Sequence, residues 1–408
     1  MTDAVHQAID WHPAIAESVG ELYRRQEGIR VARSGYFPQL SAGVVAGQDS
    51  ENDGDGNGHA LQLYVSQVIY DFGKISSGVD LAKAEVSRSR AEVLQAIDQV
   101  ARDTASAAVE VQRYQALLEI ADEQIAGVSS IASLVRMRSE RGASSRSDVL
   151  QAQSRIEAAR ASKQQVSADL ARWRSTLQNL VNAGAPVRVT MGTPETVRNA
   201  CEGPPGEVLA SPRVLIAEAS RAEAMARLQE SKADVWPTLS LDASYNRYLD
   251  QTYVDTNVLD ENESAVFLNL SMPIYQGGRL SASKESASYA LSSADAAKDA
   301  ARESVTREYR AAQAQANGLG RSLGILDARE DAISETRDLY RKQYSSLGTR
   351  TLLELLNSEE ELQQARRDRV ETRFDLKALE IECLYNTGDI RRAFGIEGRA
   401  VQGVEVLP

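Results

Sequence analysis

The chain has 408 residues, which is room for two or three ordinary domains. Its 58 acidic and 46 basic side chains give a formal net charge of −12, which argues against nucleic acid as the main partner because phosphate binding needs a basic face. Only 5% of the residues are aromatic, whereas Ala, Ser, Gln, Glu and Arg are abundant. This composition is typical of long helices rather than of a large globular core.

The sequence contains no membrane-spanning helix and no recognisable leader. No stretch approaches the ~20 apolar residues that such a helix needs. Met1-Thr2-Asp3 opens directly into sequence typical of folded structure. We therefore expect either a cytosolic protein or a mature chain that lacks its signal peptide.

The first 184 residues predict a helix, two strands, a long helix and a shorter helix. Apolar positions at helical spacing predict the first helix over 13–34. Alternating patterns over 40–46 and 61–66 then predict two strands, which an acidic, glycine-rich loop (48–59) separates.

The long helix is predicted over 75–140, which at 1.5 Å per residue is on the order of 100 Å. Its apolar positions recur at an unbroken spacing of seven: Val79, Val86, Val93, Val100, Ala107, Tyr114, Ala121, Val128 and Val135. Such a sustained repeat indicates the seam of a coiled coil rather than an ordinary surface helix.

A tight turn ends this helix and begins the next, predicted over 147–182. Gly142 follows the first helix, and a glycine just past a helix end accepts the left-handed conformation that closes it. Asp148 lies near the start of the second helix, where a carboxylate meets the positive end of the helix dipole. The two helices are therefore expected to form an antiparallel hairpin with this turn at its tip.

The same order of elements occurs a second time, with a period of about 200 residues. Trp236-Pro237 matches Phe37-Pro38, and a second tip is predicted where Gly348-Thr349-Arg350 leads into Leu353-Glu354. We therefore predict an internal duplication with four segments: repeat 1 (1–184), a linker (185–210), repeat 2 (211–388) and a C-terminal tail (389–408).

The four predicted strands, of about 11 residues each, cannot form a stable closed sheet alone. Their length and alternation suit a transmembrane barrel, whose strands need ~9–11 residues, and three chains would close a barrel of about twelve strands. Four aromatic residues fall at the helix-side ends of the strands: Phe37, Tyr70, Trp236 and Tyr275. They indicate an aromatic girdle at the membrane boundary, or alternatively plugs of the junction between strands and helices.

The chain has two cysteines, Cys201 in the linker and Cys383 near the end of the last helix. They are either unrelated buried thiols or a disulfide formed in an oxidising compartment. If the two halves are symmetric, the two positions could meet.

These features resemble the TolC family of outer-membrane efflux and secretion channels over essentially the whole chain. The resemblance rests on the two repeats and on three kinds of motif: the strand starts Phe37-Pro38 and Trp236-Pro237, the strand exits 70–74 and 275–279, and the tip 348–356. The stretches 97–104 and 138–149 look most similar to the branch that serves type I secretion of large repeat adhesins.

The resemblance implies an α+β membrane protein that forms a homotrimer. Four strands from each chain would make a twelve-stranded transmembrane β-barrel in the outer-membrane lipid of a Gram-negative bacterium. A long α-helical barrel of coiled coils would continue it into the periplasm, where an inward bend of the tip helices closes the entrance.

Residue by residue, the resemblance implies a periplasmic gate. Arg350 would bond Ser147 and Asp148 across neighbouring coils, while Glu354 and Asn357 stand where the family places an acidic constriction ring. Asn357 departs from the carboxylate common at that position. Taken without the family, these charges are ordinary complements of helix dipoles beside a turn. A periplasmic membrane-fusion adaptor would dock on the two tips, at Gly142, Ala143, Ser144, Gly348 and Thr349.

The implied function is the exit duct of a tripartite type I secretion system. The duct would passively conduct a secreted protein, such as a large adhesin, from an inner-membrane ABC transporter and the adaptor to the cell exterior. The duct of a multidrug efflux pump is the alternative within the family, and a soluble coiled-coil scaffold is the alternative outside it.

No enzyme, cofactor or metal site is predicted. The three histidines lie in the first sixty residues, without a nucleophile–base pair or metal-ligand spacing around them. Asp53, Asp55 and Asn57 match only the first half of a calcium loop, because Tyr64 stands where the bidentate Glu would be.

Overall fold

The computed structural model describes residues 1–49, 56–185, 189–192, 194–202, 210–249 and 262–406. The chain divides into two compact units. Unit 1 comprises 1–19, 93–214 and 302–408, and unit 2 comprises 20–92 and 215–301. Each unit therefore contains segments from both predicted repeats. The compact units do not coincide with the repeats.

The order helix, two strands, long helix, shorter helix occurs twice along the chain. Its first occurrence consists of α2 (Pro13–Ser34), β1 (Gln39–Asp49), β2 (Gly56–Tyr70), α3 (Lys74–Glu140) and α4 (Arg146–Leu180). Its second consists of α5 (Pro212–Ala233), β3 (Thr238–Tyr248), β4 (Asn262–Ser271), α6 (Arg279–Lys342) with a π-helical turn (Gln343–Leu347), and α7 (Leu352–Thr387). The predicted helices are confirmed to within a few residues at either end.

Some elements differ from the prediction. The first strand continues to Asp49 and the second begins at Gly56, so that both extend into the predicted loop over 48–59. A helix that the sequence reading omitted, α1 (Thr2–Trp11), precedes α2. The C-terminal tail also forms regular structure: α8 (Ile390–Ala393) and a hairpin of β5 (Ala400–Val401) and β6 (Val404–Glu405).

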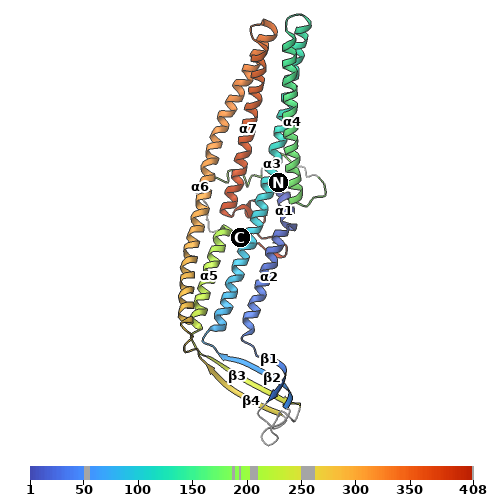
Figure 1. The fold of residues 1–408 in the computed structure, drawn as a ribbon. Coiled ribbons are helices and arrows are strands. Elements are labelled where there is room, and N and C mark those ends of the chain that lie inside the picture. Colours follow the sequence, from blue (N-terminus) through green and yellow to red (C-terminus); the bar gives the residue numbers. More distant parts are fainter. Residues whose placement is uncertain (50–55, 186–188, 193, 203–209, 250–261, 407–408) are drawn as a thin grey trace. The chain divides into compact units, whose positions relative to one another are not determined.

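Unit 2 contains a four-stranded antiparallel sheet in the order β1-β2-β3-β4 (Figure 1). The strands β2 and β3, which come from different halves of the chain, pair in the middle of the sheet over ten residue pairs with one irregularity between Val68 and Tyr70. As the outer strands of the sheet, β1 and β4 each have one neighbour in the described chain.

The register gives this sheet one apolar face. Directly paired residues lie on the same face, and side chains alternate between faces along each strand. Leu40, Leu63, Leu241 and Leu268 belong to one set of such pairs, together with Val44, Leu61, Val65, Leu239, Ala243, Tyr245, Val266 and Leu270. Ser, Gln, Asn and Asp side chains are the commonest on the opposite face, which also carries Val45, Tyr64, Val68, Tyr248 and Phe267.

The apolar face is not covered within the chain. On the two outer strands, Leu40 is 67% exposed and Leu268 is 69% exposed. Contiguous exposed apolar surface in a folded protein indicates contact with another chain or with lipid.

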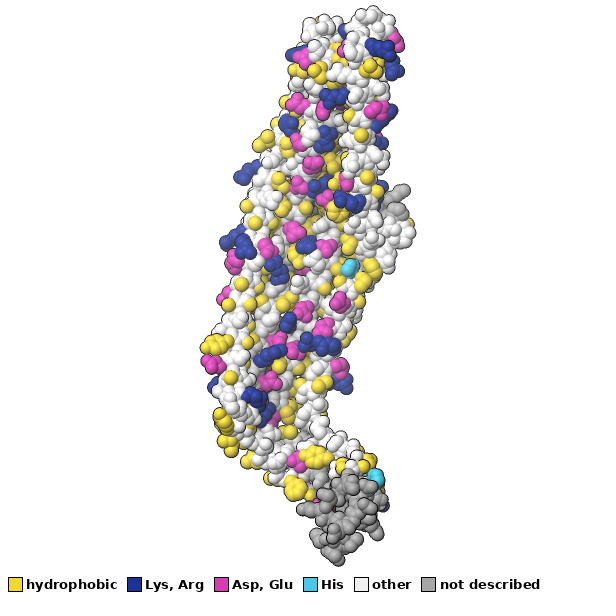
Figure 2. Space-filling view, viewed as in Figure 1, with side chains coloured by type: hydrophobic (Ala, Val, Ile, Leu, Met, Phe, Trp, Pro, Cys, Tyr) yellow, Lys and Arg dark blue, Asp and Glu magenta, His cyan; other side chains and the backbone are white. Residues whose placement is uncertain are grey.

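The coiled-coil seam predicted along α3 is confirmed by burial. Eight of its nine positions are no more than 6% exposed, and Tyr114 is half-buried. Outside the seam the helices carry mixed charge: acidic and basic side chains are interspersed over the visible helical surface (Figure 2). Among the described residues, no helix has the length and apolar content of a membrane-spanning segment.

In unit 1 the C-terminal tail is fastened to α3 by a buried ion pair. The Arg391 guanidinium lies 3.2 Å from Asp98 Oδ2, and both side chains are almost completely excluded from water. A second Arg391 nitrogen donates to the carbonyl of Ala210 (3.0 Å). Burial raises the pKa of Asp98 above its ordinary value, and the neighbouring guanidinium opposes this shift.

A disulfide joins Cys201 of the linker to Cys383 of α7, with the two Cα atoms 5.5 Å apart. The bond packs against Tyr309, Ala312 and Ala316 of α6. Nearby, the Asn199 amide donates to Glu380 (3.0 Å). The described part of the linker is thus tied to α7 covalently and by hydrogen bonding.

Candidate functional site at the helical tips

The first tip joins α3 to α4 and closes both helix ends with backbone and side-chain hydrogen bonds. Gly142 adopts a left-handed conformation (φ 76°), which lets Ala143 N–H donate to the Arg138 carbonyl (2.8 Å). Ser145 then caps α4: its hydroxyl accepts from Asp148 N–H (3.1 Å), and Asp148 accepts from Ser145 N–H (3.0 Å). This reciprocal pair is a capping box. The neighbouring Ser147 hydroxyl lies 2.7 Å from Ser145 Oγ.

The second tip repeats this arrangement between α6 and α7. Gly348 is left-handed (φ 65°), and Thr351 and Glu354 form the capping box, with Glu354 Oε2 accepting from Thr351 N–H (2.8 Å). In contrast to the first tip, the incoming helix ends in the π-helical turn of residues 343–347. Such turns are rare and occur frequently at functional sites.

Arg350 braces the second tip. Its Nη1 donates to Glu354 Oε1 (2.7 Å), its Nε donates to Gln343 Oε1 (3.1 Å), and its guanidinium lies 4.4 Å from the centre of the Tyr340 ring. The hydrogen bond from Thr351 N–H and then the Arg350 guanidinium lower the pKa of Glu354 below its ordinary value. Glu354 is therefore held as a carboxylate.

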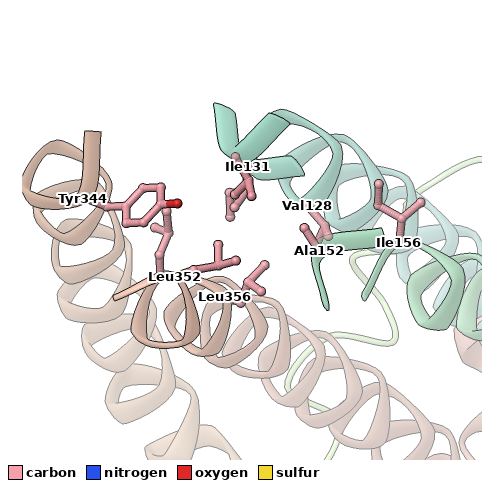
Figure 3. Close-up of a cluster of buried hydrophobic side chains, with 9 residues drawn as sticks. Val128, Ile131, Ala152, Ile156, Tyr344, Leu352 and Leu356 are labelled. Atoms are coloured by element: carbon pink, nitrogen blue, oxygen red, sulfur yellow. The ribbon is translucent and has the colours of Figure 1, made fainter. Parts of the chain in front are cut away.

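An apolar cluster packs the two tips together (Figure 3). The first helical hairpin contributes Val128, Ile131, Val135, Ala152 and Ile156, and the second contributes Tyr344, Leu352, Leu355 and Leu356. In Figure 3, Ile131 and Val128 of the first hairpin face Tyr344, Leu352 and Leu356 of the second. Burial of this cluster fixes the positions of the polar side chains around it.

Polar contacts around Tyr344 cross between the tips. The Arg138 Nη1 donates to the Tyr344 carbonyl (2.8 Å), and its guanidinium lies 4.8 Å from the centre of the Tyr344 ring. The Tyr344 hydroxyl is 3.2 Å from Ser144 Oγ. Sequence reasoning missed Arg138 and Tyr344 as site residues.

The predicted gate residues occupy the two tips but are not all in contact. Within the described residues of this chain, Arg350 pairs with Glu354, and Ser147 and Asp148 belong to the cap of α4. The bonds from Arg350 to Ser147 and Asp148 across neighbouring coils therefore stay a prediction.

Asn357 is exposed one turn after Glu354, where its side-chain oxygen accepts from Arg155 of α4 (3.3 Å). The same guanidinium forms an ion pair with Glu360. Asn357 thus contributes to the contact between α4 and α7.

The predicted docking residues lie on accessible surface. Gly142, Ala143, Gly348 and Thr349 are exposed, and Ser144 is half-buried beside Tyr344. An added Cβ would meet nothing within 4 Å at either Gly142 or Gly348. The backbone at both turns is therefore accessible to solvent.

The four aromatic residues predicted as a girdle belong to unit 2, where each is more than half exposed: Phe37, Tyr70, Trp236 and Tyr275. Phe72, which the prediction omitted, stacks on Trp236 with 5.6 Å between ring centres and packs edge-on against Tyr70 at 4.6 Å. The aromatic group therefore contains a stacked cluster at the end of β2 and the start of β3.

In the described ranges, no group of three or more His, Cys, Asp or Glu side chains is arranged to hold a metal ion. Asp53 and Asp55 of the partial calcium pattern lie outside the described residues.

Comparison with known proteins gives matches over nearly the whole chain. The sequence profile described as "Outer membrane efflux protein" matches residues 4–183 and 207–382. Outer membrane efflux protein BepC of Brucella suis biovar 1 is 22% identical over 402 residues, which are 95% of this chain and 85% of that protein. Outer membrane protein TolC of Vibrio cholerae serotype O1 is 23% identical over 388 residues, covering 92% of this chain and 87% of that protein.

The fold is shared with solved structures. A crystal structure of CusC superposes with a TM-score of 0.85 at 16% sequence identity, covering 95% of this chain and 91% of that one.

Proposed function

Because the chain belongs to the outer membrane efflux protein family, we propose that it is the outer-membrane exit duct of a tripartite type I secretion system. In this role it passively conducts a secreted protein from an inner-membrane ABC transporter, through a periplasmic adaptor, to the cell exterior. The observation that carries the proposal is the four-stranded sheet with one apolar and one polar face, joined in the same chain to long helices with exposed tips.

A trimer would give the two outer strands of the sheet the neighbouring strands that they lack within one chain. Among the described residues, β1 and β4 each have one edge without a neighbouring strand, and exposed edges pair readily with another chain. Pairing β4 of one protomer with β1 of the next closes about twelve strands into a barrel, with the apolar face toward lipid and the polar face inside. CusC, which shares the fold, has structures concerned with transmembrane channel formation.

The tips are the proposed periplasmic gate and adaptor-docking site. Their residues combine open backbone at Gly142 and Gly348 with a charged brace at Arg350 and Glu354. Across neighbouring protomers, Arg350 can reach Ser147 and Asp148 when the tips bend inward, and Glu354 with Asn357 then narrows the entrance. An adaptor that binds the open tips more tightly than the closed tips shifts the equilibrium toward the open gate, by as much as its affinities for the two states differ.

Mass measurement in detergent tests the assembly. Light scattering on the purified chain should give a protein mass of about three times 44.4 kDa, and withdrawal of detergent should precipitate the particle. A monodisperse monomer or dimer that needs no detergent would remove the barrel and leave the coiled-coil scaffold as the working alternative.

The second candidate function is the duct of a multidrug efflux pump, which the name of the relative BepC favours. The stretches 97–104 and 138–149, which resemble the secretion branch, support the first candidate. Deletion of the gene in its own host separates the two. Loss of one large secreted protein with unchanged drug susceptibility supports secretion, and increased drug susceptibility with normal secretion supports efflux.

A further inference from the structure

A buried carboxylate joins three helices close to the tips. We propose that Glu359, seated over Gly127 and held by Arg337, is a positioning residue that fixes α7 against α3 in the closed gate. We call these three residues the Glu359 clamp. The inference rests on the proposed function of the tips as a gate, and it adds a residue set that acts through Glu354 and Arg350 rather than lining the entrance.

Glu359 is paired on both carboxylate oxygens. Its side chain is 2% exposed, and its Oε2 accepts from Arg337 Nη1 of α6 (3.0 Å). Its Oε1 accepts from Gln363 Nε2, one turn along α7 (3.0 Å). A carboxylate removed from water in this way depends on its partners, because loss of one leaves an uncompensated buried charge.

Gly127 is the residue of α3 against which the Glu359 carboxylate packs. A Cβ at this position of α3 would lie 2.2 Å from Glu359 Oε1 and 2.8 Å from its Cδ. Glycine inside a helix is unfavourable relative to alanine. At position 127 the close approach of the Glu359 carboxylate leaves no room for an alanine Cβ, whereas Gly320 of α6 has open space there.

The atoms that an alanine at position 127 would meet are the end of a side chain rather than backbone. Glu359 can therefore yield only by leaving Arg337 and Gln363, or α7 can yield by moving away from α3. Either response opens the clamp.

The clamp is connected to the gate along the same helices. Glu359 follows Glu354 by five residues on α7. Between the clamp and the tip, Arg341 of α6 donates to Ser130 of α3 (2.6 Å), and Arg138 of α3 donates to the Tyr344 carbonyl (2.8 Å). Contacts between α3 and the second hairpin thus continue from Gly127 to the turn, so that a shift of α7 at the clamp is carried to Arg350.

Conductance of the full-length protein in planar bilayers tests the clamp. Gly127→Ala and Glu359→Gln should each raise the closed-state conductance several-fold over the wild type. Gly320→Ala on α6 is the matched control, because nothing lies within 4 Å of its added Cβ. It should leave the conductance unchanged.

A double variant separates gating from general destabilisation. Once Glu359→Ala has removed the carboxylate, adding Gly127→Ala should cause no further rise in the closed-state conductance. The added Cβ then no longer overlaps with a carboxylate. Thermal unfolding of each variant is recorded beside its conductance.

Wild-type conductance in Gly127→Ala and Glu359→Gln, with a lowered unfolding temperature, would overturn the clamp and leave the duct intact. Full additivity of Gly127→Ala and Glu359→Ala would overturn it as well. A wild-type protein that forms no channel would instead remove the proposed function, and the clamp with it. If Gly127→Ala fails to fold, Glu359→Gln still decides the outcome.

Discussion

The two tips have the same turn and different reinforcement. Gly142 corresponds to Gly348, and the capping pair Ser145–Asp148 corresponds to Thr351–Glu354. In the same alignment of the two tips, Ser144 of the first corresponds to Arg350 of the second. The first tip follows a regular α-helix, whereas the second follows a π-helical turn and carries the Arg350 brace.

This difference shows that the same capping box can stand alone, as at the first tip, or be reinforced by further side-chain contacts, as at the second. Capping satisfies the backbone groups at the start of each outgoing helix in the same way at both tips. Within the part of the chain that the structure describes, a guanidinium binds the capping carboxylate at the second tip and not at the first. This Arg350 guanidinium also contacts Gln343 and Tyr340, which precede the turn. The second tip is therefore the better candidate for the part of the gate that holds a set position.

The largest expected effect comes from removing the side chain that packs the second tip against the first. Tyr344 is 4% exposed inside the apolar cluster. Tyr344→Ala should lower the free energy of local opening at both tips by about 3–5 kcal/mol, or by their entire local stability if that is less. Hydrogen exchange of the tip amides measures the change.

The matched control for this change is Tyr289→Ala, since Tyr289 lies on the same helix and is 68% exposed. It should change local stability by no more than about 0.5 kcal/mol. Equal effects of the two variants would show that the cluster does not hold the tips together.

A smaller effect at the second tip is expected from acid. Its capping Glu354 has a pKa lowered from the ordinary 4.5, first by the Thr351 amide and then by Arg350. A carboxyl with a lowered folded-state pKa stabilises the folded tip fully above its ordinary pKa, and the contribution is lost as pH falls through the lowered value. Arg350→Ser removes one cause of the shift, so that protection of the second tip should be lost at a higher pH than in the wild type.

Hydrogen exchange is measured between pH 6 and pH 3 and corrected for intrinsic rates. It gives the pH at which protection of the second tip is half lost, in the wild type and in Arg350→Ser. The first tip serves as the internal control, since Arg350 contacts none of its capping residues among those described here. An unchanged midpoint at the second tip would mean that Arg350 does not hold Glu354.

The smallest expected effect is one that the tips share. Gly142→Ala and Gly348→Ala each place an L side chain at positive φ in open space, so that backbone strain is the main cost. Each should lower the local stability of its own tip by about 1–2 kcal/mol. Local opening measured by hydrogen exchange should give similar values, and a clearly larger cost at one tip would reveal a contact that the turn geometry does not show.

Local chemistry in the sequence was enough to predict the long helices, the strands β1 to β4 and both turns, but not α1, α8 or the hairpin of β5 and β6. The glycines, the Ser and Thr caps and the spacing of seven along α3 each act over a few residues, so that they can be recognised without a structure. The apolar face of the sheet also followed from alternation.

The pairings between distant residues could not be predicted in the same way. Glu359 and Gly127 are separated by more than two hundred residues, and nothing in either neighbourhood indicates the other. The sequence places Asp148 and Glu354 each near the start of a helix beside a tip turn, and it does not say which of the two Arg350 contacts. In the structure Arg350 pairs with Glu354 and also contacts Tyr340 and Gln343. The π-helical turn has no composition that separates it from an ordinary helix end.

Single-channel conductance in planar lipid bilayers tests most directly whether the tips gate a membrane duct. We predict a small conductance for the wild type and a larger one for Arg350→Ser, with a further increase when Asp148→Ala is added. Arg160→Ser, which removes an exposed guanidinium of α4, should behave as the wild type. Wild-type channels that already conduct fully, with no change in any variant, would contradict a gate at the tips, and the absence of conductance in every protein would contradict the duct itself.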